Sequence, residues 1–182
     1  MSIKIRLLLV FAVMLNSACV ASKDTKPDSR TVASEGIKPG DEVVFQDWRK
    51  RCRNVNKKGN VCLIYQNLTV KDSGESMLYA TFSFAGKDDK LVASFRVPFG
   101  ILLTPGIAVK VDQNEQINYA IQTCLSDGCY AYVNIKDELL TQFKNGVQAK
   151  VGFMTMHKKQ MAVNLSLKGF DAAINSLRGE YN

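Results

Sequence analysis

The sequence predicts an all-β fold, a single antiparallel β-sandwich or barrel-like domain with two short peripheral helices. Three observations lead to this prediction. Apolar and polar residues alternate in about nine short runs that are rich in Val, Phe, Tyr, Ile and Thr. Turn-forming groups such as Asp-Ser-Gly (72–74) and Ser-Asp-Gly (126–128) separate most of these runs. Only two segments carry helix start and stop residues.

The predicted strands follow one another from residue 41 to residue 167. They occupy 41–48, 61–70, 77–85, 91–97, 107–111, 117–124, 129–135, 147–156 and 160–167. Short strands at this spacing are typical of sandwiches and barrels. Because no internal repeat or low-complexity tract interrupts the series, we expect one domain over residues 41–182.

The two predicted helices lie late in the chain. Residues 136–144 have acidic side chains near the start, Lys144 at the end and Gly146 just beyond. Residues 170–177 are bracketed by Gly169 and Gly179. This order of charges and glycines favours a short helix in each segment. We expect both helices to cover one end of a sheet.

Residues 1–21 have the composition of a secretory signal peptide. Lys4 and Arg6 precede an apolar run over 7–15, which is too short to span a bilayer, and small residues follow it. Residues 22–40 contain no aromatic residue and carry charges of both signs, so they predict a flexible tether. We therefore expect an exported protein. Either Cys19 is lipidated as the first mature residue, or cleavage after Ala21 removes it.

Four cysteines remain for the domain: Cys52, Cys62, Cys124 and Cys129. Cysteines of an exported protein usually form disulfides, and four of them permit three connectivities. Each local pair brackets a turn, which favours Cys52–Cys62 and Cys124–Cys129. A zinc site is the alternative, but neither spacing is of the C-x-x-C type that zinc sites and thioredoxin-like redox centres use.

Motifs of aromatic, Gly, Pro and Cys residues follow one another along the domain. They are Phe45-x-Asp47-Trp48-x3-Cys52, Cys62-x-Ile64-Tyr65-Gln66-Asn67-Leu68, Phe95-x-Val97-Pro98-x-Gly100-Ile101-x-Leu103-x-Pro105-Gly106-Ile107, Cys124-x4-Cys129 and Leu165-x-Leu167-x-Gly169-Phe170-x-Ala172-Ala173-x3-Leu177. In this order, over about residues 45–177, the chain resembles the invasion-associated locus B family of exported bacterial proteins. The resemblance implies a β-rich domain of a Gram-negative bacterium that is periplasmic, outer-membrane-associated or secreted. In some members of the family it is linked to entry into host cells.

The motif residues have structural explanations. We expect Trp48 to be buried near a disulfide, and Gly106 to adopt a backbone angle that other residues avoid. Phe99, Ile101 and Leu102 could line a ligand groove, although apolar runs of this kind are usually core.

Neither a catalytic residue nor a cofactor nor a metal site is predicted. A serine nucleophile needs a base, but the single histidine, His157, lies beside a predicted turn, and the chain contains no Gly-x-Ser-x-Gly motif to pair with it. Met154, Met156, His157 and Met161 contain the soft ligands that Cu(I) prefers. However, Met154 and Met156 would point to one face of a strand and His157 to the other, so we favour methionines as core filler and an exposed histidine.

The charge of the chain is concentrated in one segment. From Ser22 onward there are 22 Lys and Arg against 17 acidic residues, and residues 49–58 hold six of the bases and no acid. We interpret this segment as a basic loop whose two flanks are held together by the proposed Cys52–Cys62 disulfide. It is expected to bind an anionic surface through Arg49, Lys50, Arg51, Arg53, Lys57 and Lys58.

The expected ligands of this loop are lipopolysaccharide, lipid phosphate or a host glycan. Nucleic acid is not expected, because an exported protein does not meet it and only one aromatic residue adjoins the loop. A solvated edge that discourages strand pairing is the simpler explanation of the charges. The alternative function is a structural envelope component that docks on another envelope protein. A membrane is expected only through an N-terminal lipid, and the oligomeric state stays open.

Overall fold

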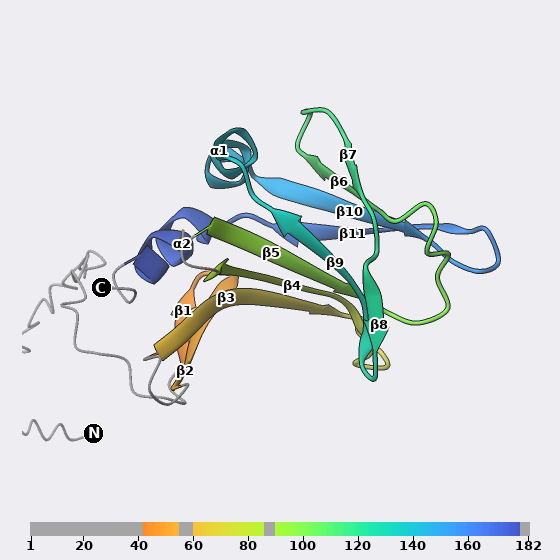
Figure 1. Ribbon diagram of the computed structural model, residues 1–182, viewed down its shortest axis with the longest axis horizontal. Coiled ribbons are helices and arrows are strands. Elements are labelled where there is room, and N and C mark those ends of the chain that lie inside the picture. Colours follow the sequence, from red (N-terminus) through yellow and green to blue (C-terminus); the bar gives the residue numbers. More distant parts are fainter. Residues whose placement is uncertain (1–41, 55–59, 86–89, 179–182) are drawn as a thin grey trace, which may run out of the picture. The chain divides into compact units, whose positions relative to one another are not determined.

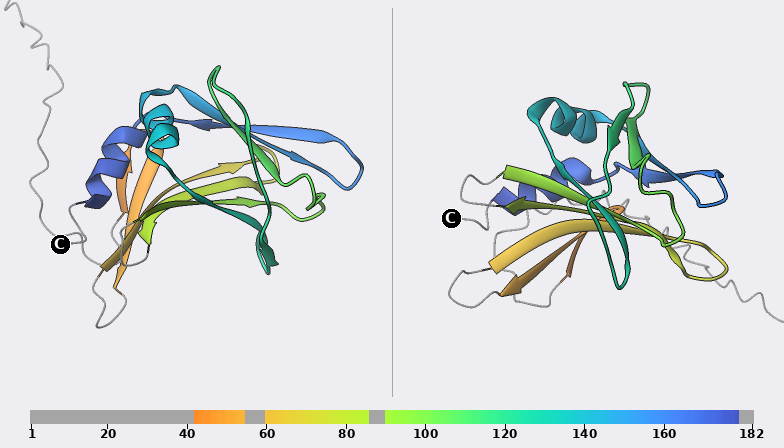
Figure 2. Two further views of the ribbon diagram at one scale, coloured as in Figure 1. Left: turned by 45° about the horizontal axis from the view of Figure 1, so that its top comes forward. Right: turned by 45° about the vertical axis from the view of Figure 1, so that its right-hand side comes forward.

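The computed structural model describes residues 42–54, 60–85 and 90–178. The predicted signal peptide, the predicted tether and Cys19, Lys57 and Lys58 lie outside these residues. The described part contains two antiparallel sheets and two short helices, which confirms the predicted all-β class in its sandwich form (Figure 1). Figure 2 shows the two layers and places both helices at the same end of them.

The larger sheet has seven strands in the order β1-β2-β3-β4-β5-β9-β8. Their bounds are β1 Glu42–Phe45, β2 Trp48–Asn54, β3 Asn60–Thr69, β4 Ser76–Ala85, β5 Lys90–Val97, β8 Thr123–Leu125 and β9 Gly128–Asn134. The smaller sheet has the order β11-β10-β6-β7. Its strands are β6 Ile107–Val111, β7 Ile117–Tyr119, β10 Gln148–Met154 and β11 Gln160–Ser166.

The core lies between the layers and is rich in aromatic rings. Trp48, Phe82 and Phe170 are fully buried and meet edge to face, with ring centroids 4.9 to 5.5 Å apart. Each such pair contributes about 0.5–1.5 kcal/mol beyond the burial of its area. The expectation that Trp48 is buried is therefore confirmed.

The two helices are found where the sequence predicts them, as α1 Asp137–Asn145 and α2 Phe170–Arg178. The buried residues of α2 recur at intervals of three and four, which is the pattern of one apolar face: Phe170, Ala173, Ile174 and Leu177. Lys144 of α1 pairs with Asp171 of α2 at 2.9 Å. Each charge lies at the helix end that its sign favours, so the pair also suits both helix dipoles.

The interpretation of residues 49–58 as a loop is wrong for 49–54. These residues lie in β2, which pairs with β1 and with β3. The predicted strand 41–48 ends at Phe45, and the chain turns at Gln46, whose φ is 54°. Trp48, Lys50 and Cys52 are buried and the arginines between them are exposed, so the segment has the period of two that a half-buried strand requires.

The predicted strand 117–124 is divided between the two sheets. β7 pairs with β6 in the smaller sheet, and β8 pairs with β9 in the larger one. The chain crosses between the layers at residues 120–122, where the Gln122 N–H donates to the Tyr130 carbonyl at 2.9 Å. Gly106 has a φ of 69°, and a Cβ there would overlap the Tyr119 carbonyl, so its expected unusual angle is confirmed.

Candidate functional site

The structure separates the basic residues of β2 into two groups. Arg49, Arg51 and Arg53 are exposed on its outer side. Lys50 is 2% exposed, and its Nζ donates to the Ser176 carbonyl in the last turn of α2 at 2.9 Å. An ammonium at the C-terminal end of a helix interacts favourably with the helix dipole. Lys50 therefore connects β2 to α2 by a hydrogen bond within the core. Its ammonium is not accessible to a surface ligand, so the prediction that Lys50 binds an anionic surface is wrong.

Both disulfides join residues that lie directly opposite each other on neighbouring strands. Cys52 and Cys62 connect β2 to β3 with a Cα–Cα distance of 4.0 Å. Cys124 and Cys129 connect β8 to β9 with a Cα–Cα distance of 3.9 Å. These are the local pairings that the sequence favours. The first disulfide holds the basic strand β2 at a fixed register on the sheet.

The outer face of the seven-stranded sheet carries a row of aromatic and basic side chains. Strand pairing places Tyr79 opposite Arg96 and Arg96 opposite Tyr130, while Arg49 lies opposite Tyr65. We call this surface the tyrosine–arginine face and define it by Arg49, Arg51, Arg53, Tyr65, Tyr79, Arg96, Tyr130 and Tyr132. These residues come from five neighbouring strands, which follow one another across the sheet in the order β2, β3, β4, β5 and β9. The opposite side of each strand is buried in the core.

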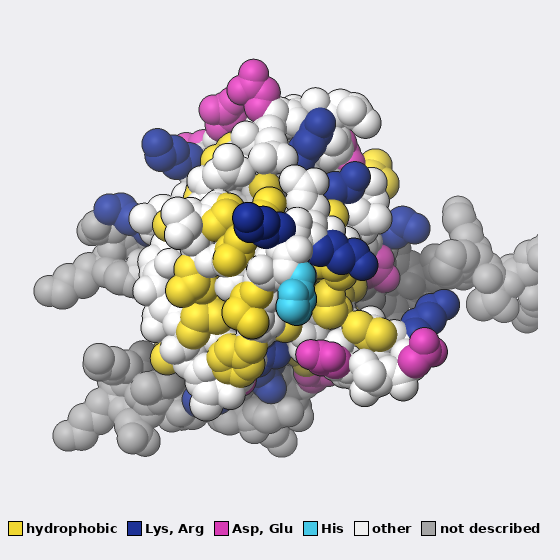
Figure 3. Space-filling view, turned by 90° about the vertical axis from the view of Figure 1, so that its right-hand side faces the viewer, with side chains coloured by type: hydrophobic (Ala, Val, Ile, Leu, Met, Phe, Trp, Pro, Cys, Tyr) yellow, Lys and Arg dark blue, Asp and Glu magenta, His cyan; other side chains and the backbone are white. Residues whose placement is uncertain are grey.

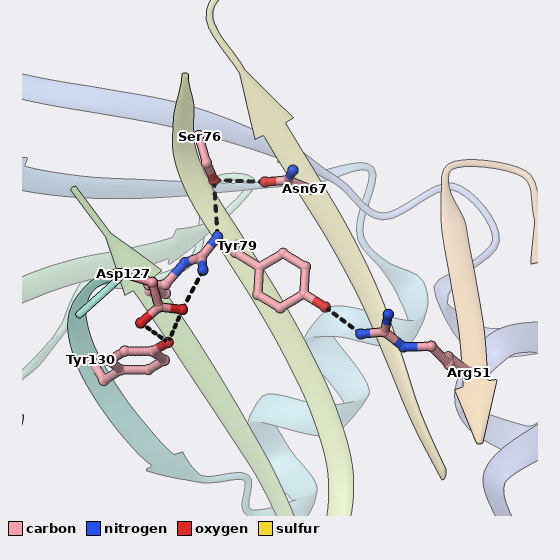
Figure 4. Close-up of polar contacts among 7 residues, drawn as sticks. Arg51, Asn67, Ser76, Tyr79, Asp127 and Tyr130 are labelled. Atoms are coloured by element: carbon pink, nitrogen blue, oxygen red, sulfur yellow. Dashed lines mark hydrogen bonds and ion pairs between the residues drawn. The ribbon is translucent and has the colours of Figure 1, made fainter. Parts of the chain in front are cut away.

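Two arginines of this face lie over tyrosine rings. The Arg51 guanidinium is 5.3 Å from the centre of the Tyr65 ring. It also donates to the Tyr79 hydroxyl at 3.5 Å (Figure 4). The Arg96 guanidinium is 4.9 Å from the centre of the Tyr79 ring. Cation–π contacts at exposed sites are worth about 0.5–1 kcal/mol each. They help to fix the orientation of the two guanidinium groups.

A carboxylate lies near each end of the face. Glu42 pairs with Arg49 at 2.6 Å and accepts a hydrogen bond from the Tyr65 hydroxyl. The Tyr65 hydroxyl and then Arg49 hold the pKa of Glu42 below its usual range. Glu42 therefore stays ionised at neutral pH. The carboxylate at the other end of the face, Asp127, has the equivalent partners, a tyrosine hydroxyl and an arginine.

Asp127 accepts a hydrogen bond from the Tyr130 hydroxyl at 2.7 Å and pairs with Arg96 at 2.6 Å (Figure 4). The Tyr130 hydroxyl and then Arg96 lower the pKa of this carboxyl group. Arg96 also donates to Ser76, whose hydroxyl donates in turn to Asn67 at 2.6 Å. Hydrogen bonds thus link the turn before β9 to β4 and β3 and hold Arg96 in one orientation.

A hollow of about 640 Å³ adjoins the face beside the β1–β2 turn. It is lined by Gln46, Asp47, Arg49, Tyr65, Asn67 and Asn164 among others. Behind it, the buried Gln66 amide donates to the Asp47 and Ser166 carbonyls and accepts from the Ser166 N–H, at 3.1 to 3.2 Å. This network joins the two sheets and fixes the wall. Amide, hydroxyl and guanidinium groups of this kind can bind sugar hydroxyls and anionic oxygens.

Sequence reasoning identified the arginines of β2 but missed their partners. Tyr65, Tyr79, Arg96 and Tyr130 are far apart in the chain, and only the strand order brings them together. The signal that the sequence does contain is that each occupies an outward position of its alternating strand.

The methionine segment differs in part from expectation. His157 is exposed as expected, but Met156 is exposed as well and is not core filler. Within the described residues, no three His, Cys, Asp or Glu side chains are grouped so that they could hold a metal ion. In that same part of the chain, neither helix has the length and hydropathy needed to cross a membrane.

Comparison with known proteins gives a consistent result. A family model described as Invasion associated locus B (IalB) protein matches residues 48–178. Two invasion protein B homologs of Brucella abortus, from strain 2308 and from biovar 1 strain 9-941, are each 29% identical to the chain over 140 residues, which are 75% of this chain and 79% of each homolog. The crystal structure of invasion associated protein B from Bartonella henselae superposes with a TM-score of 0.68 at 20% identity, over 76% of this chain and 95% of that chain. The superposition shows a shared fold.

Proposed function

The chain belongs to the invasion associated locus B family, and on that premise we propose that it is a non-enzymatic binding protein whose tyrosine–arginine face contacts an anionic surface. The family and the two disulfides indicate an exported protein. The ligands that fit are lipopolysaccharide, lipid phosphate or a sulfated host glycan. Binding of this kind would contribute to host-cell interaction, in keeping with the names of its relatives.

The observation that carries the proposal is the set of arginines on one exposed surface. Arg49, Arg51 and Arg53 come from β2, and Arg96 comes from β5. Guanidinium groups donate two parallel hydrogen bonds to phosphate and sulfate, a geometry that lysine does not provide. Tyr and Arg are also the residues that most often dominate binding surfaces.

Arg51 is the residue we place at the centre of binding. Its contacts with Tyr65 and Tyr79 hold the guanidinium over the sheet before a ligand arrives. Pre-orientation of this kind lowers the entropy lost on binding. Arg49 and Arg96 are paired with carboxylates, so they serve more to position the face than to neutralise a ligand.

The hollow beside the face favours a glycan among these ligands. It offers Asn67 and Asn164 to hydroxyl groups, next to the Tyr65 ring and the Arg49 guanidinium. A sugar that carries sulfate or phosphate could place its ring in the hollow and its anionic group toward Arg51. The charges then supply the attraction, and the amides supply orientation.

The test compares two double variants that lose the same charge. Arg51→Gln/Arg53→Gln should weaken binding to heparin or lipopolysaccharide by about tenfold or more at low salt. Lys150→Gln/Lys168→Gln, which removes two exposed lysines from the region of the smaller sheet, should leave binding nearly unchanged. Binding of the unaltered protein should weaken as salt is added.

Equal binding of both variants to heparin, lipopolysaccharide and anionic vesicles would contradict the proposal. Salt-insensitive co-purification with one envelope protein would instead favour a structural component of the envelope, the alternative function. Thermal unfolding of each variant serves as the control for folding. Lys50 is left unchanged in these variants, because its side chain lies in the core.

A further inference from the structure

Two loops at the end of the molecule away from the helices carry exposed apolar side chains (Figure 3). Phe99 and Leu103, between β5 and β6, are 58% and 51% exposed. Met156, in the turn between β10 and β11, is 63% exposed. We call these three residues the apolar tip. They lie outside the tyrosine–arginine face and play no part in the function proposed above.

The two loops are bonded to each other, so the apolar tip is presented on a fixed backbone. Ile101 forms an isolated β-bridge with Thr155. On either side of it, the Leu102 N–H donates to the Met154 carbonyl at 2.8 Å, and the Met156 N–H donates to the Gly100 carbonyl at 2.9 Å. Ile101 is buried and anchors the first loop in the core. Of the apolar run that we favoured as core, Ile101 is therefore buried as expected, whereas Phe99 is exposed.

The segments that form the apolar tip carry positive charge and no negative charge. Neither residues 91–111 nor residues 139–170 contain Asp or Glu. The turn after Met156 continues with His157, Lys158 and Lys159, all exposed. Figure 3 shows hydrophobic side chains gathered at this end with His and several Lys or Arg beside them; acidic side chains border the group at its lower right.

Exposed apolar side chains next to lysines are suited to binding at the interface of an anionic membrane. Apolar groups gain free energy by entering the boundary between headgroups and acyl chains, and nearby lysines gain it from anionic lipid phosphates. A second copy of the chain fits less well. A symmetric contact through the tip would bring Lys158 and Lys159 of both copies together without an acidic partner from the same segments.

We propose that the apolar tip inserts into the headgroup region of an anionic lipid bilayer, with Lys158 and Lys159 bound to lipid phosphates. The bound molecule stands on the end of the sandwich that lies opposite its helices. The tyrosine–arginine face then runs away from the bilayer surface and stays accessible to a second ligand.

The test uses the full chain with Cys19→Ser, which removes any N-terminal acyl group as a second membrane anchor. Sedimentation with vesicles of phosphatidylcholine and phosphatidylglycerol measures partitioning. Phe99→Ser/Leu103→Ser/Met156→Ser should lower it by more than about tenfold. Lys158→Gln/Lys159→Gln should lower it by about fivefold for each lysine, and only on vesicles that contain phosphatidylglycerol.

The matched control removes equally exposed apolar groups elsewhere. Val44→Ser/Val147→Ser replaces side chains that are 59% and 67% exposed and should leave partitioning unchanged. A second readout reports depth. Tryptophan at position 99, introduced as Phe99→Trp, should be quenched by brominated lipids, whereas Val147→Trp and the buried Trp48 should not.

Unchanged partitioning of the Phe99, Leu103 and Met156 triple variant, or a Phe99→Trp variant that binds vesicles without being quenched, would overturn the proposal. Arg51→Gln/Arg53→Gln separates it from the function proposed above. That variant should lose heparin binding and keep the quenching at position 99. If the arginine variant lost vesicle binding while the triple variant kept it in full, membrane insertion of the apolar tip would be overturned. The proposed binding by the tyrosine–arginine face would be unaffected.

Discussion

Removing the two disulfides one at a time should destabilise the domain to different degrees. The variants are Cys52→Ala/Cys62→Ala and Cys124→Ala/Cys129→Ala. The first disulfide closes a separation of 10 residues, and the second closes a separation of 5. Both are directly cross-strand, so neither variant is expected to change the pairing of its strands.

The expected magnitudes follow from loop closure and burial. The chain-entropy relation gives about 2.7 kcal/mol for the separation of 10 residues and about 2.1 kcal/mol for the separation of 5. Removing a buried sulfur adds about 1 kcal/mol, as removing a buried methylene does. Cys52 and Cys62 are both buried, whereas Cys124 is exposed. The first pair should therefore cost about 1.5 kcal/mol more than the second.

Urea unfolding followed by Trp48 fluorescence and far-ultraviolet circular dichroism measures both costs. The slope m should rise in each variant, because an unlinked chain exposes more surface when it unfolds. Free energies extrapolated to water are therefore compared, instead of midpoints. A second-pair variant that loses as much stability as the first, or more, would refute the reasoning from loop length and burial.

Two further predictions concern backbone and charge. Gly106→Ala should lower the Tm clearly more than Gly74→Ala. The φ angle is near +70° at both positions, where alanine costs about 1–2 kcal/mol. Of the two, only Gly106 has a neighbour that a Cβ would overlap, the Tyr119 carbonyl. Equal losses would show that the Tyr119 contact is irrelevant. The lowered pKa of Asp127 adds stability that is present above the unfolded pKa and is lost as pH falls through the folded one. Asp127→Asn should therefore reduce the fall in Tm between about pH 5 and about pH 2, and an unaltered pH profile would contradict this assignment.

The sequence predicts most elements because their local patterns agree with their packing. β6 is found at the predicted residues 107–111, and α2 has the predicted start at Phe170. β2 was missed because of Lys50, which occupies an inward position where a strand normally places an apolar residue. The partner of its ammonium is a carbonyl 126 positions later in the chain, so no local pattern could identify it.

The candidate site was predicted only in part for the same reason. Arg49, Arg51 and Arg53 are neighbours in sequence, and a charge count finds them. Tyr79 and Arg96 become their neighbours through the order β2-β3-β4-β5, which the sequence does not specify. The division of 117–124 also depends on tertiary structure, because the two halves pair with different sheets.

The contacts of β2 with the end of the chain have a consequence for the order of assembly. The Trp48 indole and the Lys50 ammonium bond carbonyls that lie 118 and 126 positions later. A polypeptide that emerges N-terminus first, from a ribosome or an export channel, presents its first hairpin long before those partners arrive. Until those partners arrive, the hairpin lacks the two hydrogen bonds that join it to the end of the chain. The contacts of β2 are therefore completed only after both β11 and α2 have emerged.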